Sequence, residues 1–387
     1  MRRSSFIRVL LVSVLVLVLD SAGAAGATPA QRSRLALDTV CNVAPAGYAT
    51  CDAQVVVGAV ATPASTTAGK PRGLTPADIR SAYALSATAG RGRTVAVISA
   101  YDNPAAAANL AVYRRTFGLP ACTIANGCLR KVSQSGGSRM PVANAAWASE
   151  TDLDLDMVSA ACASCRILLV QATTSSMVNL ATAVNYAATQ QVSAISNSYS
   201  SSDTSQSAAY DHPGIAITAS TGDNGHSANA PATYRTVIAV GGTSLKRANN
   251  ARGWTETAWA GSGSGCSTKN AKPQWQTTAS SCPGKAVADV AAVADPRTGV
   301  ATYQGKSGWQ VFGGTSAATP IIAGVYALSG NTKGYPGSYT WAHQGGLNDI
   351  TSGSTGTCSG YPSRWCTARP GWDGPTGLGS PRGTSSF

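Results

Sequence analysis

The chain has 387 residues and a formal net charge of +12, with 12% charged and 43% hydrophobic residues. Its length suits one large α/β domain with a short leader. Lysines and arginines are scattered, with no basic run longer than a pair. This pattern favours a solvated basic surface over a nucleic-acid partner.

The N-terminus, residues 1–27, predicts a signal peptide. Two arginines lead an apolar run that ends near Leu19, and small residues with two A-x-A signals follow as far as Ala27. The run is shorter than the ~20 residues that a spanning helix needs, which favours a cleaved signal over a membrane anchor. No other stretch approaches that length without polar residues. We therefore expect a secreted, extracellular protein with no membrane association after signal removal.

Residues 28–73 are rich in Ala, Thr and Pro and predict a short N-terminal extension or a truncated pro-segment. The pattern changes at Gly73, where Thr75 is a suitable N-cap and Pro76 a suitable first helical residue. The main domain is therefore predicted to span residues 74–387.

The ten cysteines fall into close sequence neighbours. In an exported chain this indicates disulfides between neighbours. A redox or zinc motif at Cys162-Ala-Ser-Cys165 is the alternative, but no second CxxC or paired histidine accompanies it. The expected pairs are Cys41 with Cys51, Cys122 with Cys128, Cys162 with Cys165, Cys266 with Cys282, and Cys358 with Cys366.

Short apolar runs alternate with helical stretches from residue 94 onward. Such runs predict parallel strands buried on both faces, joined by right-handed crossovers. The fold class is therefore an α/β, doubly wound sheet of mostly parallel strands with helices on both faces, and ligands should bind at the carboxyl ends of the strands. Strands are predicted at 94–99, 167–171, 192–196, 215–219 and 236–240, and helices near 104–117, 144–161 and 177–189.

A serine, Ser316, lies in a glycine-rich turn between an apolar segment at 309–312 and an apolar helix at 321–328. A serine at such a turn exposes its hydroxyl, and its backbone N–H is among the free donors of the helix start, where it can stabilise an oxyanion. A simple N-cap serine is the alternative.

The predicted helix near 144–161 carries four carboxylates. Glu150 and Asp154 share a face with Trp147 and Val158, whereas Asp152 and Asp156 fall on a polar stripe. We therefore expect the first two carboxylates to face inward and the other two to be solvated. Two like charges on a half-buried stripe are costly unless they share a proton or serve chemistry. A capping or fold-specific polar pair is the alternative.

Over residues 74–387 these motifs resemble the sedolisins, serine-carboxyl peptidases with a subtilisin-like fold. The GTSxxxP motif around Ser316 resembles the nucleophile motif that subtilisins and sedolisins share. Asp223, in the stretch 219–225, stands where subtilisins carry an asparagine and sedolisins an aspartate. The Glu150-xxx-Asp154 pair resembles the sedolisin pair. None of the chain's three histidines lies in a subtilisin-type HGT motif, and the strand 94–99 ends on Ser99 rather than an aspartate.

The resemblance implies a role for each motif residue. Ser316 would be the nucleophile, Glu150 its general base, and Asp154 the residue that orients Glu150. Asp223 would donate to the oxyanion together with the Ser316 N–H. Ser198 and Tyr199, in the motif 196–199, would line the substrate site. The substrates would be proteins or peptides, and the protein a monomer.

Carboxylate chemistry at this serine implies activity in acid. A carboxylate is a weak base toward serine unless burial and a neighbouring acid raise its pKa. Asp223 donates a hydrogen bond only when it is protonated. An activity maximum well below neutral pH is therefore expected.

The C-terminal region holds two aspartates in loops, Asp349 and Asp373, which suit one Ca²⁺ ion. The resemblance adds the carbonyl oxygens of Ile350, Arg369 and Gly371 as ligands. Arg369 stands where the family usually has glycine, and its carbonyl serves as a ligand only if the backbone there suits a non-glycine residue.

Two other functions remain open at the level of sequence. One is a His-dependent, subtilisin-type peptidase that uses His226 or His212. The other is a non-catalytic extracellular binding protein on a peptidase fold. Sedolisins usually carry a long pro-domain, so the short segment 28–73 also leaves the route of activation open.

Overall fold

The computed structural model describes residue 1 and residues 36–57 and 71–387, except 280, 332, 357 and 359. Residues 2–27 of the predicted signal peptide lie outside the described residues. Within the described part, no helix is long and apolar enough to cross a membrane.

An eight-stranded sheet forms the centre, and its strands run in the order β12-β11-β9-β7-β4-β6-β5, with β15 also paired to β11. All neighbours are parallel except β11 and β12. The five predicted strands are confirmed as β4, β6, β7, β9 and β11, and the doubly wound topology is confirmed with them. The bounds are β4 Thr94–Ala100, β5 Leu129–Ser133, β6 Arg166–Ala172, β7 Ala194–Asn197, β9 Ala216–Ser220, β11 Ile238–Arg247, β12 Trp254–Ala258 and β15 Val290–Val293.

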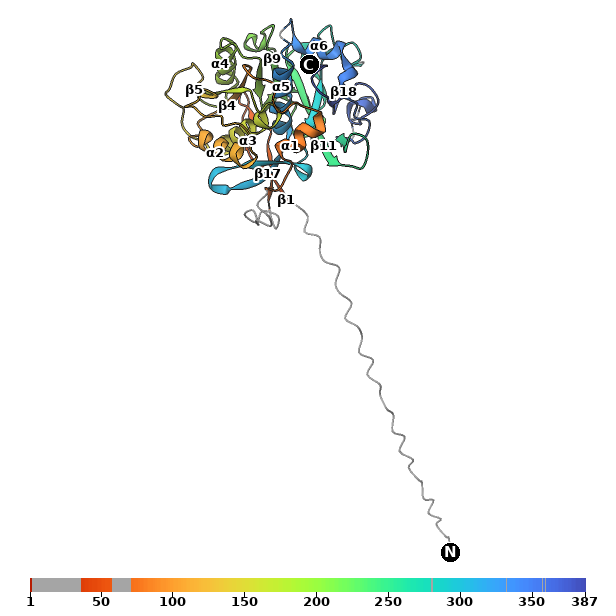
Figure 1. Ribbon diagram of the computed structural model, residues 1–387. Coiled ribbons are helices and arrows are strands. Elements are labelled where there is room, and N and C mark those ends of the chain that lie inside the picture. Colours follow the sequence, from red (N-terminus) through yellow and green to blue (C-terminus); the bar gives the residue numbers. More distant parts are fainter. Residues whose placement is uncertain (2–35, 58–70, 280, 332, 357, 359) are drawn as a thin grey trace. The chain divides into compact units, whose positions relative to one another are not determined.

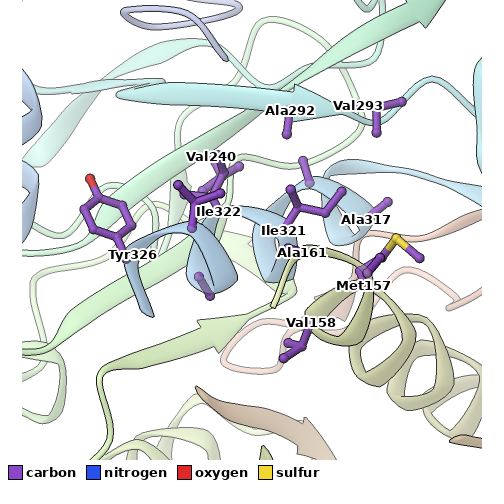
Figure 2. Packing of buried hydrophobic residues seen from close by; sticks show 14 of the residues in the cluster. Met157, Val158, Ala161, Val240, Ala292, Val293, Ala317, Ile321, Ile322 and Tyr326 are labelled. Carbon is purple, nitrogen blue, oxygen red and sulfur yellow. The ribbon is translucent and has the colours of Figure 1, made fainter. Parts of the chain in front are cut away.

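Helices cover both faces of this sheet because its strands are apolar on both sides. Along β4, Val95 and Val97 pack into the core on the side of α3 and α5, whereas Ala96 and Ile98 pack on the side of α4. Figure 2 shows α3 and α5 meeting in the first of these cores, around Met157. The helices are α1 Pro76–Tyr83, α2 Ala106–Thr116, α3 Ala145–Ala161, α4 Met177–Ala188, α5 Thr315–Ser329 and α6 Pro336–Ala342 (Figure 1).

Helix α1 begins as the sequence predicts. The Thr75 side chain accepts a hydrogen bond from the Asp78 backbone N–H at 3.3 Å, and the Asp78 carboxylate accepts from the Thr75 N–H at 2.9 Å. Pro76 is the first helical residue. This reciprocal cap satisfies donors that the first turn would otherwise leave free.

A second sheet joins residues 36–57 to the same body as residues 71–387. It is antiparallel, in the order β1-β3-β17-β16. The short strand β2 pairs antiparallel with β8. The segment 28–73, predicted to be an extension, thus supplies three strands to this body. The bounds are β1 Ala36–Thr39, β2 Thr50–Cys51, β3 Gln54–Val57, β8 Tyr199–Ser202, β16 Val300–Tyr303 and β17 Trp309–Gly313.

Small elements complete the described fold. The strand β10, Asn229–Ala230, extends the β2–β8 pair. Two separate pairs are β13 Gly265–Ala271 with β14 Gly284–Val287, and β18 Leu347–Asn348 with β19 Ser380–Pro381. All five predicted disulfides are confirmed, including Cys162–Cys165, and no described cysteine is free.

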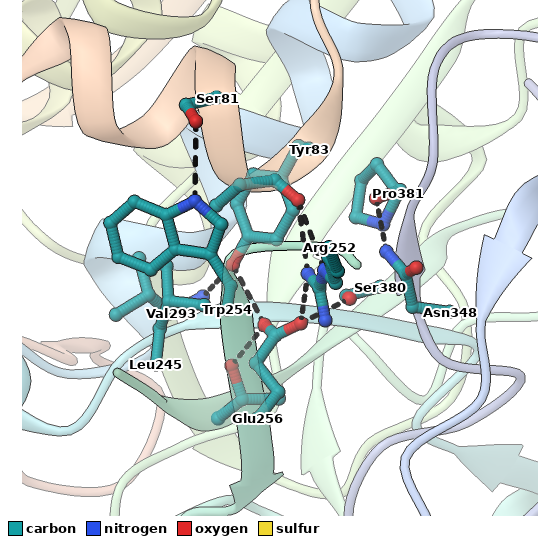
Figure 3. Close-up of polar contacts among 12 residues, drawn as sticks. Ser81, Tyr83, Leu245, Arg252, Trp254, Glu256, Val293, Asn348, Ser380 and Pro381 are labelled. Carbon is teal, nitrogen blue, oxygen red and sulfur yellow. Dashed lines mark hydrogen bonds and ion pairs between the residues drawn. The ribbon is translucent and has the colours of Figure 1, made fainter. Parts of the chain in front are cut away.

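The buried carboxylate of Glu256 ties α1 to the strands beneath it (Figure 3). Its Oε1 accepts hydrogen bonds from the Tyr83 hydroxyl at 2.9 Å and from Thr243 Oγ1 at 2.7 Å. Its Oε2 accepts from Arg252 at 2.6 Å and from Ser380 Oγ at 2.5 Å. A charge in this position is satisfied on both oxygens, as burial requires.

Candidate active site

Ser316 lies in the first turn of α5, two residues after a glycine whose position does not suit a side chain. Gly314 has φ +95°, and a Cβ there would come within 2.1 Å of the Asp52 carbonyl oxygen and 2.6 Å of Asp223 Oδ2. The glycine therefore lets two chemical groups approach the start of the helix closely. Ser316 itself is fully buried, and its Oγ donates to the Ser198 carbonyl oxygen at 3.1 Å.

Glu150 and Asp154 of α3 are both buried, as the spacing predicts, and Glu150 lies beside the Ser316 hydroxyl. Burial raises the pKa of Glu150 well above its usual range, the Asp154 charge raises it further, and contact with the Ser316 hydroxyl lowers it. No hydrogen bond of good geometry reaches either Glu150 oxygen from the described residues. A buried carboxyl without donors favours its neutral form and readily accepts a proton when it is ionised.

Asp154 is held by Ser198. The Ser198 Oγ donates to Asp154 Oδ1 at 2.5 Å, while Oδ2 has no hydrogen-bond partner among the described residues. Burial raises the pKa of Asp154 well above its usual range, against the lowering effect of the Ser198 hydrogen bond. Glu150, Asp154, Ser198 and Ser316 thus form one connected group between α3, β8 and α5.

Asp223 follows β9 and also reaches the start of α5. Its Oδ1 accepts from the Thr315 backbone N–H at 2.7 Å and from Thr315 Oγ1 at 2.9 Å. Its Oδ2 lies beside Gly314, and no hydrogen bond of good geometry reaches it, although the Gln54 side chain is near enough to lower the pKa. Burial and the Asp52 charge raise the pKa of Asp223 well above its usual range, against the lowering effect of the hydrogen bonds from Thr315 and Gln54. A protonated Oδ2 would be a free donor at this point.

Tyr199 is placed differently from the other candidates. Its side chain is buried in the core beside Trp147, and its hydroxyl donates to Asn197 Oδ1 at 2.7 Å. Its backbone pairs with Cys51 of β2. The structure thus brings Ser316, Glu150, Asp154, Asp223 and Ser198 together but turns the tyrosine ring away from them.

Asp52 is part of this site, although sequence reasoning missed it. Its carbonyl oxygen accepts the Ser316 backbone N–H at 2.9 Å. Its side chain is buried and accepts from Ser200 Oγ at 2.7 Å and Ser220 Oγ at 2.5 Å. Burial raises the pKa of Asp52 to about 6, while the two serine hydrogen bonds lower it. The only sequence signal nearby was the cysteine pair that includes Cys51, and it predicted only a disulfide.

The prediction that Asp152 and Asp156 are solvated is wrong. Their exposed fractions are 5% and 1%. Asp152 accepts from the side-chain amides of Asn103 and Asn109, each at 2.8 Å, and Asp156 accepts from the Tyr303 N–H at 3.0 Å. Helix α3 contacts α1, α2, α5, β4 and β16, and every residue from 150 to 161 is buried, so this part of the helix has no solvent-facing side.

The histidines lie elsewhere in the described structure. His212 is exposed and contacts Asn185, and the His226 ring packs against Tyr361. No described hydrogen bond joins either ring to Ser316. The His-dependent alternative therefore finds no support in the geometry.

The five candidate calcium ligands lie on two neighbouring loops. Asp349 Oδ2 accepts from the Gly371 N–H at 2.8 Å, and Asp373 Oδ2 accepts from the Arg369 N–H at 2.9 Å. Asp373 is fully buried, which raises its pKa to about 7, and Asp349 adds to the rise. The described hydrogen bonds include none to the carbonyl oxygens of Ile350, Arg369 or Gly371.

This donor set fits a hard cation. Two carboxylates and three carbonyl oxygens would supply five of the six to eight oxygens that Ca²⁺ takes. Arg369 is not among the residues with positive φ, so a side chain is compatible with the backbone at that position.

Taken together, the buried groups suit nucleophilic attack on a carbonyl. A serine hydroxyl lies beside a carboxyl of raised pKa, and a backbone N–H and a second carboxyl face the same point from the other side. This is the geometry of an activated nucleophile with an oxyanion site.

Comparison with known proteins gives matches in sequence and in structure. The sequence matches the Subtilase family over residues 137–361. Kumamolisin of Bacillus sp. is 29% identical over 360 residues, covering 81% of this chain and 63% of kumamolisin. Sedolisin of Pseudomonas sp. is 32% identical over 174 residues, covering 40% of this chain and 29% of sedolisin. The chain thus spans less than two thirds of the length of these relatives.

Two solved structures are also similar. Pseudomonas sedolisin, a serine-carboxyl proteinase complexed with two molecules of pseudo-iodotyrostatin, aligns with a TM-score of 0.68 and 25% identity. That alignment covers 81% of this chain and 96% of the sedolisin chain. The S41 psychrophilic protease aligns with a TM-score of 0.51 and 18% identity, which is a similarity of fold alone.

Proposed function

The chain belongs to the subtilase family, among the sedolisins, and from this premise we propose that it is a secreted serine-type endopeptidase that hydrolyses protein and peptide substrates in acid. One observation carries the proposal. Ser316 is surrounded by three buried carboxyls of raised pKa, and no histidine contacts it in the described structure.

The first half of the reaction forms an ester. The Ser316 Oγ attacks the carbonyl carbon of the scissile peptide bond, and its proton passes to Glu150. The negative charge that develops on the carbonyl oxygen is stabilised by the Ser316 N–H and by a protonated Asp223. Glu150 then gives its proton to the leaving amine, and the C–N bond breaks.

The second half releases the acid. Water attacks the ester carbon, and Glu150 takes the water proton and returns it to the Ser316 Oγ. The products are a carboxylic acid and an amine, and the enzyme is restored. Asp154, held by Ser198, positions Glu150 and raises its pKa, which makes the carboxylate a stronger base.

The pH dependence follows from two carboxyls with opposite requirements. Asp223 donates only while it is protonated, so activity falls as pH rises through its pKa. Glu150 accepts a proton only while it is ionised, so activity also falls at the acid end. We expect a bell-shaped kcat/KM profile with its maximum below neutral pH. A rate that keeps rising through pH 7 would contradict the proposal.

The direct test is a digest of a denatured protein mixture between pH 3 and 8, with cleavage sites read by mass spectrometry. Ser316→Ala should lower kcat by up to about 10⁶-fold, and Glu150→Gln by at least about 10²-fold. Ser86→Ala, at an exposed serine far from the site in sequence, is the control and should cleave as the wild type does. Cleavage that persists in Ser316→Ala would exclude this serine as the nucleophile. Absence of cleavage in the wild type would favour a non-catalytic binding protein.

We also propose that one Ca²⁺ is bound by the side chains of Asp349 and Asp373 and the carbonyl oxygens of Ile350, Arg369 and Gly371. When bound, the ion would neutralise two neighbouring carboxylates and link the loop after β18 to the loop before β19. The proposal is supported by the buried Asp373 and by the three carbonyl oxygens without described donors.

A further inference from the structure

Residues 50–54, from β2 to the start of β3, pass directly beside Ser316. Thr50 pairs with Ser200, Cys51 pairs with Tyr199, and the Asp52 N–H donates to the Ser198 carbonyl oxygen at 3.4 Å. The pairing is antiparallel. Addition of a strand to an exposed sheet edge is a common way for proteins to bind extended peptides, with main-chain bonds for affinity and pockets for specificity.

The position of one carbonyl group fixes the register of this strand. The Asp52 carbonyl oxygen accepts the Ser316 N–H at 2.9 Å and lies against Gly314. In the proposed mechanism this is the place of the carbonyl oxygen under attack. The Asp52–Ala53 bond therefore stands where the scissile bond of a substrate stands, and the Asp52 side chain fills the S1 pocket, which receives the residue on the acyl side.

The S1 pocket is built around the carboxyl of Asp52. Ser200 Oγ donates to Oδ1 at 2.7 Å and Ser220 Oγ donates to Oδ2 at 2.5 Å. Neither hydroxyl has another hydrogen bond among the described residues, and no described ion pair includes Asp52. Two neutral donors, one for each oxygen, recognise an acid by hydrogen bonding in its ionised form and also suit it when it is protonated.

From this occupancy we propose that Ser200 and Ser220 are specificity-determining residues and that the enzyme prefers an acidic residue, aspartate above all, on the acyl side of the cleaved bond. The inference rests on the proposed peptidase function and names its substrate class. An aliphatic side chain in the pocket would leave the buried Ser220 hydroxyl and the half-buried Ser200 hydroxyl without their hydrogen-bond partner, which is unfavourable. A site built for hydrogen bonds rejects a substrate that lacks them for this reason.

The preference suits the proposed working pH. Burial raises the pKa of Asp52 to about 6, so an aspartyl side chain in this pocket is largely neutral in acid. Loss of its charge removes much of the desolvation cost of entering a pocket without cations.

The test uses peptides that differ only at the acyl-side residue, which is Asp, Glu, Asn or Leu, at the pH of maximum activity. They are given to the full chain and to its Asp52→Ala variant, in which the pocket no longer holds the chain's own Asp52 carboxyl.

We expect kcat/KM for the Asp peptide to exceed that for the Leu peptide by about 10- to 100-fold, since two hydrogen bonds of roughly 1 kcal/mol each are lost with the Leu peptide. Ser220→Ala should lower this ratio about tenfold. Ser201→Ala, at the neighbouring position on β8, is the matched control and should not change it.

The outcomes separate the two proposals. Cleavage with no preference for Asp over Leu, or a preference that survives in Ser220→Ala, would overturn the specificity inference and leave the peptidase intact. Absence of cleavage of every peptide by both proteins would overturn the peptidase function and the inference with it. Retention of the Asp preference by Ser201→Ala and its loss in Ser220→Ala would support both.

Discussion

Asp223 uses its two carboxyl oxygens differently. Oδ1 accepts two hydrogen bonds from Thr315, whereas Oδ2 is turned toward Gly314 and the carbonyl that the Ser316 N–H contacts. One oxygen thus fixes the side chain, and the other is left for the oxyanion. This division makes the role of the proton testable at the scale of one residue.

Replacement of this acid by its amide should keep the geometry and remove the pH requirement. In Asp223→Asn the Oδ1 can still accept from Thr315, and the Nδ2 donates at every pH. We expect the high-pH limb of kcat/KM to move upward by at least one pH unit, while Asp223→Ala lowers kcat by about 10²- to 10³-fold. Both are measured as pH–rate profiles against the wild type. An unmoved high-pH limb in Asp223→Asn would show that this proton does not control the limb.

The proposed catalytic residues could be located from the sequence because motif and spacing place them locally. Ser316 follows from a glycine-rich helix start, and Glu150 and Asp154 from a four-residue spacing on one helix. Asp52 could not be predicted in the same way. It reaches the site through pairing of β2 with β8 and β3 with β17, strands far apart in the sequence, and short strands of this kind leave no periodic signal.

At the scale of elements, α3 shows where the reasoning from helical stripes fails. A stripe of Asp152 and Asp156 indicates a solvent face only if the helix has one. In α3 the stripe is covered by other parts of the chain. The side-chain amides of Asn103 and Asn109 donate hydrogen bonds to the buried Asp152 carboxylate. The sequence of the helix alone does not show whether Asp152 and Asp156 contact water or buried polar partners. The five apolar runs predicted as strands carried no such ambiguity and were confirmed, whereas β5, β12 and β15 of the same sheet were not predicted.

The polar group around Glu256 should contribute strongly to stability. Glu256→Gln places an amide donor or a neutral oxygen against Arg252 and Ser380, which leaves the half-buried Arg252 cation without its charged partner. We expect a loss of about 3 kcal/mol in the free energy of unfolding, measured by urea denaturation. Arg247→Ala, which removes an exposed ion pair with Asp78, is the comparison and should cost about 1 kcal/mol or less. Equal losses in the two variants would contradict this assignment.

Calcium removal should loosen the two loops that carry Asp349 and Asp373. With Ca²⁺ at about 100 times its Kd, binding adds about 2.7 kcal/mol of stability. Chelation should therefore lower the thermal midpoint by about 5 °C. Scanning calorimetry with Ca²⁺ and with EGTA measures the shift, and Asp373→Asn should reduce it. An identical midpoint under both conditions would exclude a stabilising calcium site.

At the scale of the whole molecule, buried carboxyls make the fold more stable in acid. Burial raises the pKa of Asp52 to about 6 and of Asp152 to about 7, and it raises those of Glu150, Asp154 and Asp156 as well. A carboxyl whose pKa is raised by folding contributes to the free energy of unfolding. This contribution is fully present below the unfolded-state pKa near 4 and is lost as pH rises through the folded-state pKa.

We therefore expect the free energy of unfolding to be larger at pH 4 than at pH 7.5, by on the order of a few kcal/mol. Urea denaturation at pH 4, 6 and 7.5, with Ca²⁺ held constant, measures the trend. Asp152→Asn removes one titrating group and should make the trend shallower. A maximum of stability near neutral pH would show that other groups outweigh these carboxyls.

The pairing of β1 with β3 affects what would follow if the bond between Asp52 and Ala53 were cut. These strands lie on opposite sides of the Asp52–Ala53 bond, are hydrogen-bonded to each other, and are reinforced by the Cys41–Cys51 disulfide. A break at this bond would leave both new ends in place, each at an effective concentration of millimolar or more relative to the other. Re-formation of the Asp52–Ala53 bond would then compete with departure of the new ends. A free substrate would compete with these attached ends for the same site. Release of this segment from Ser316 would therefore require the pairing of β1 with β3 to open, and not only the scission of one bond.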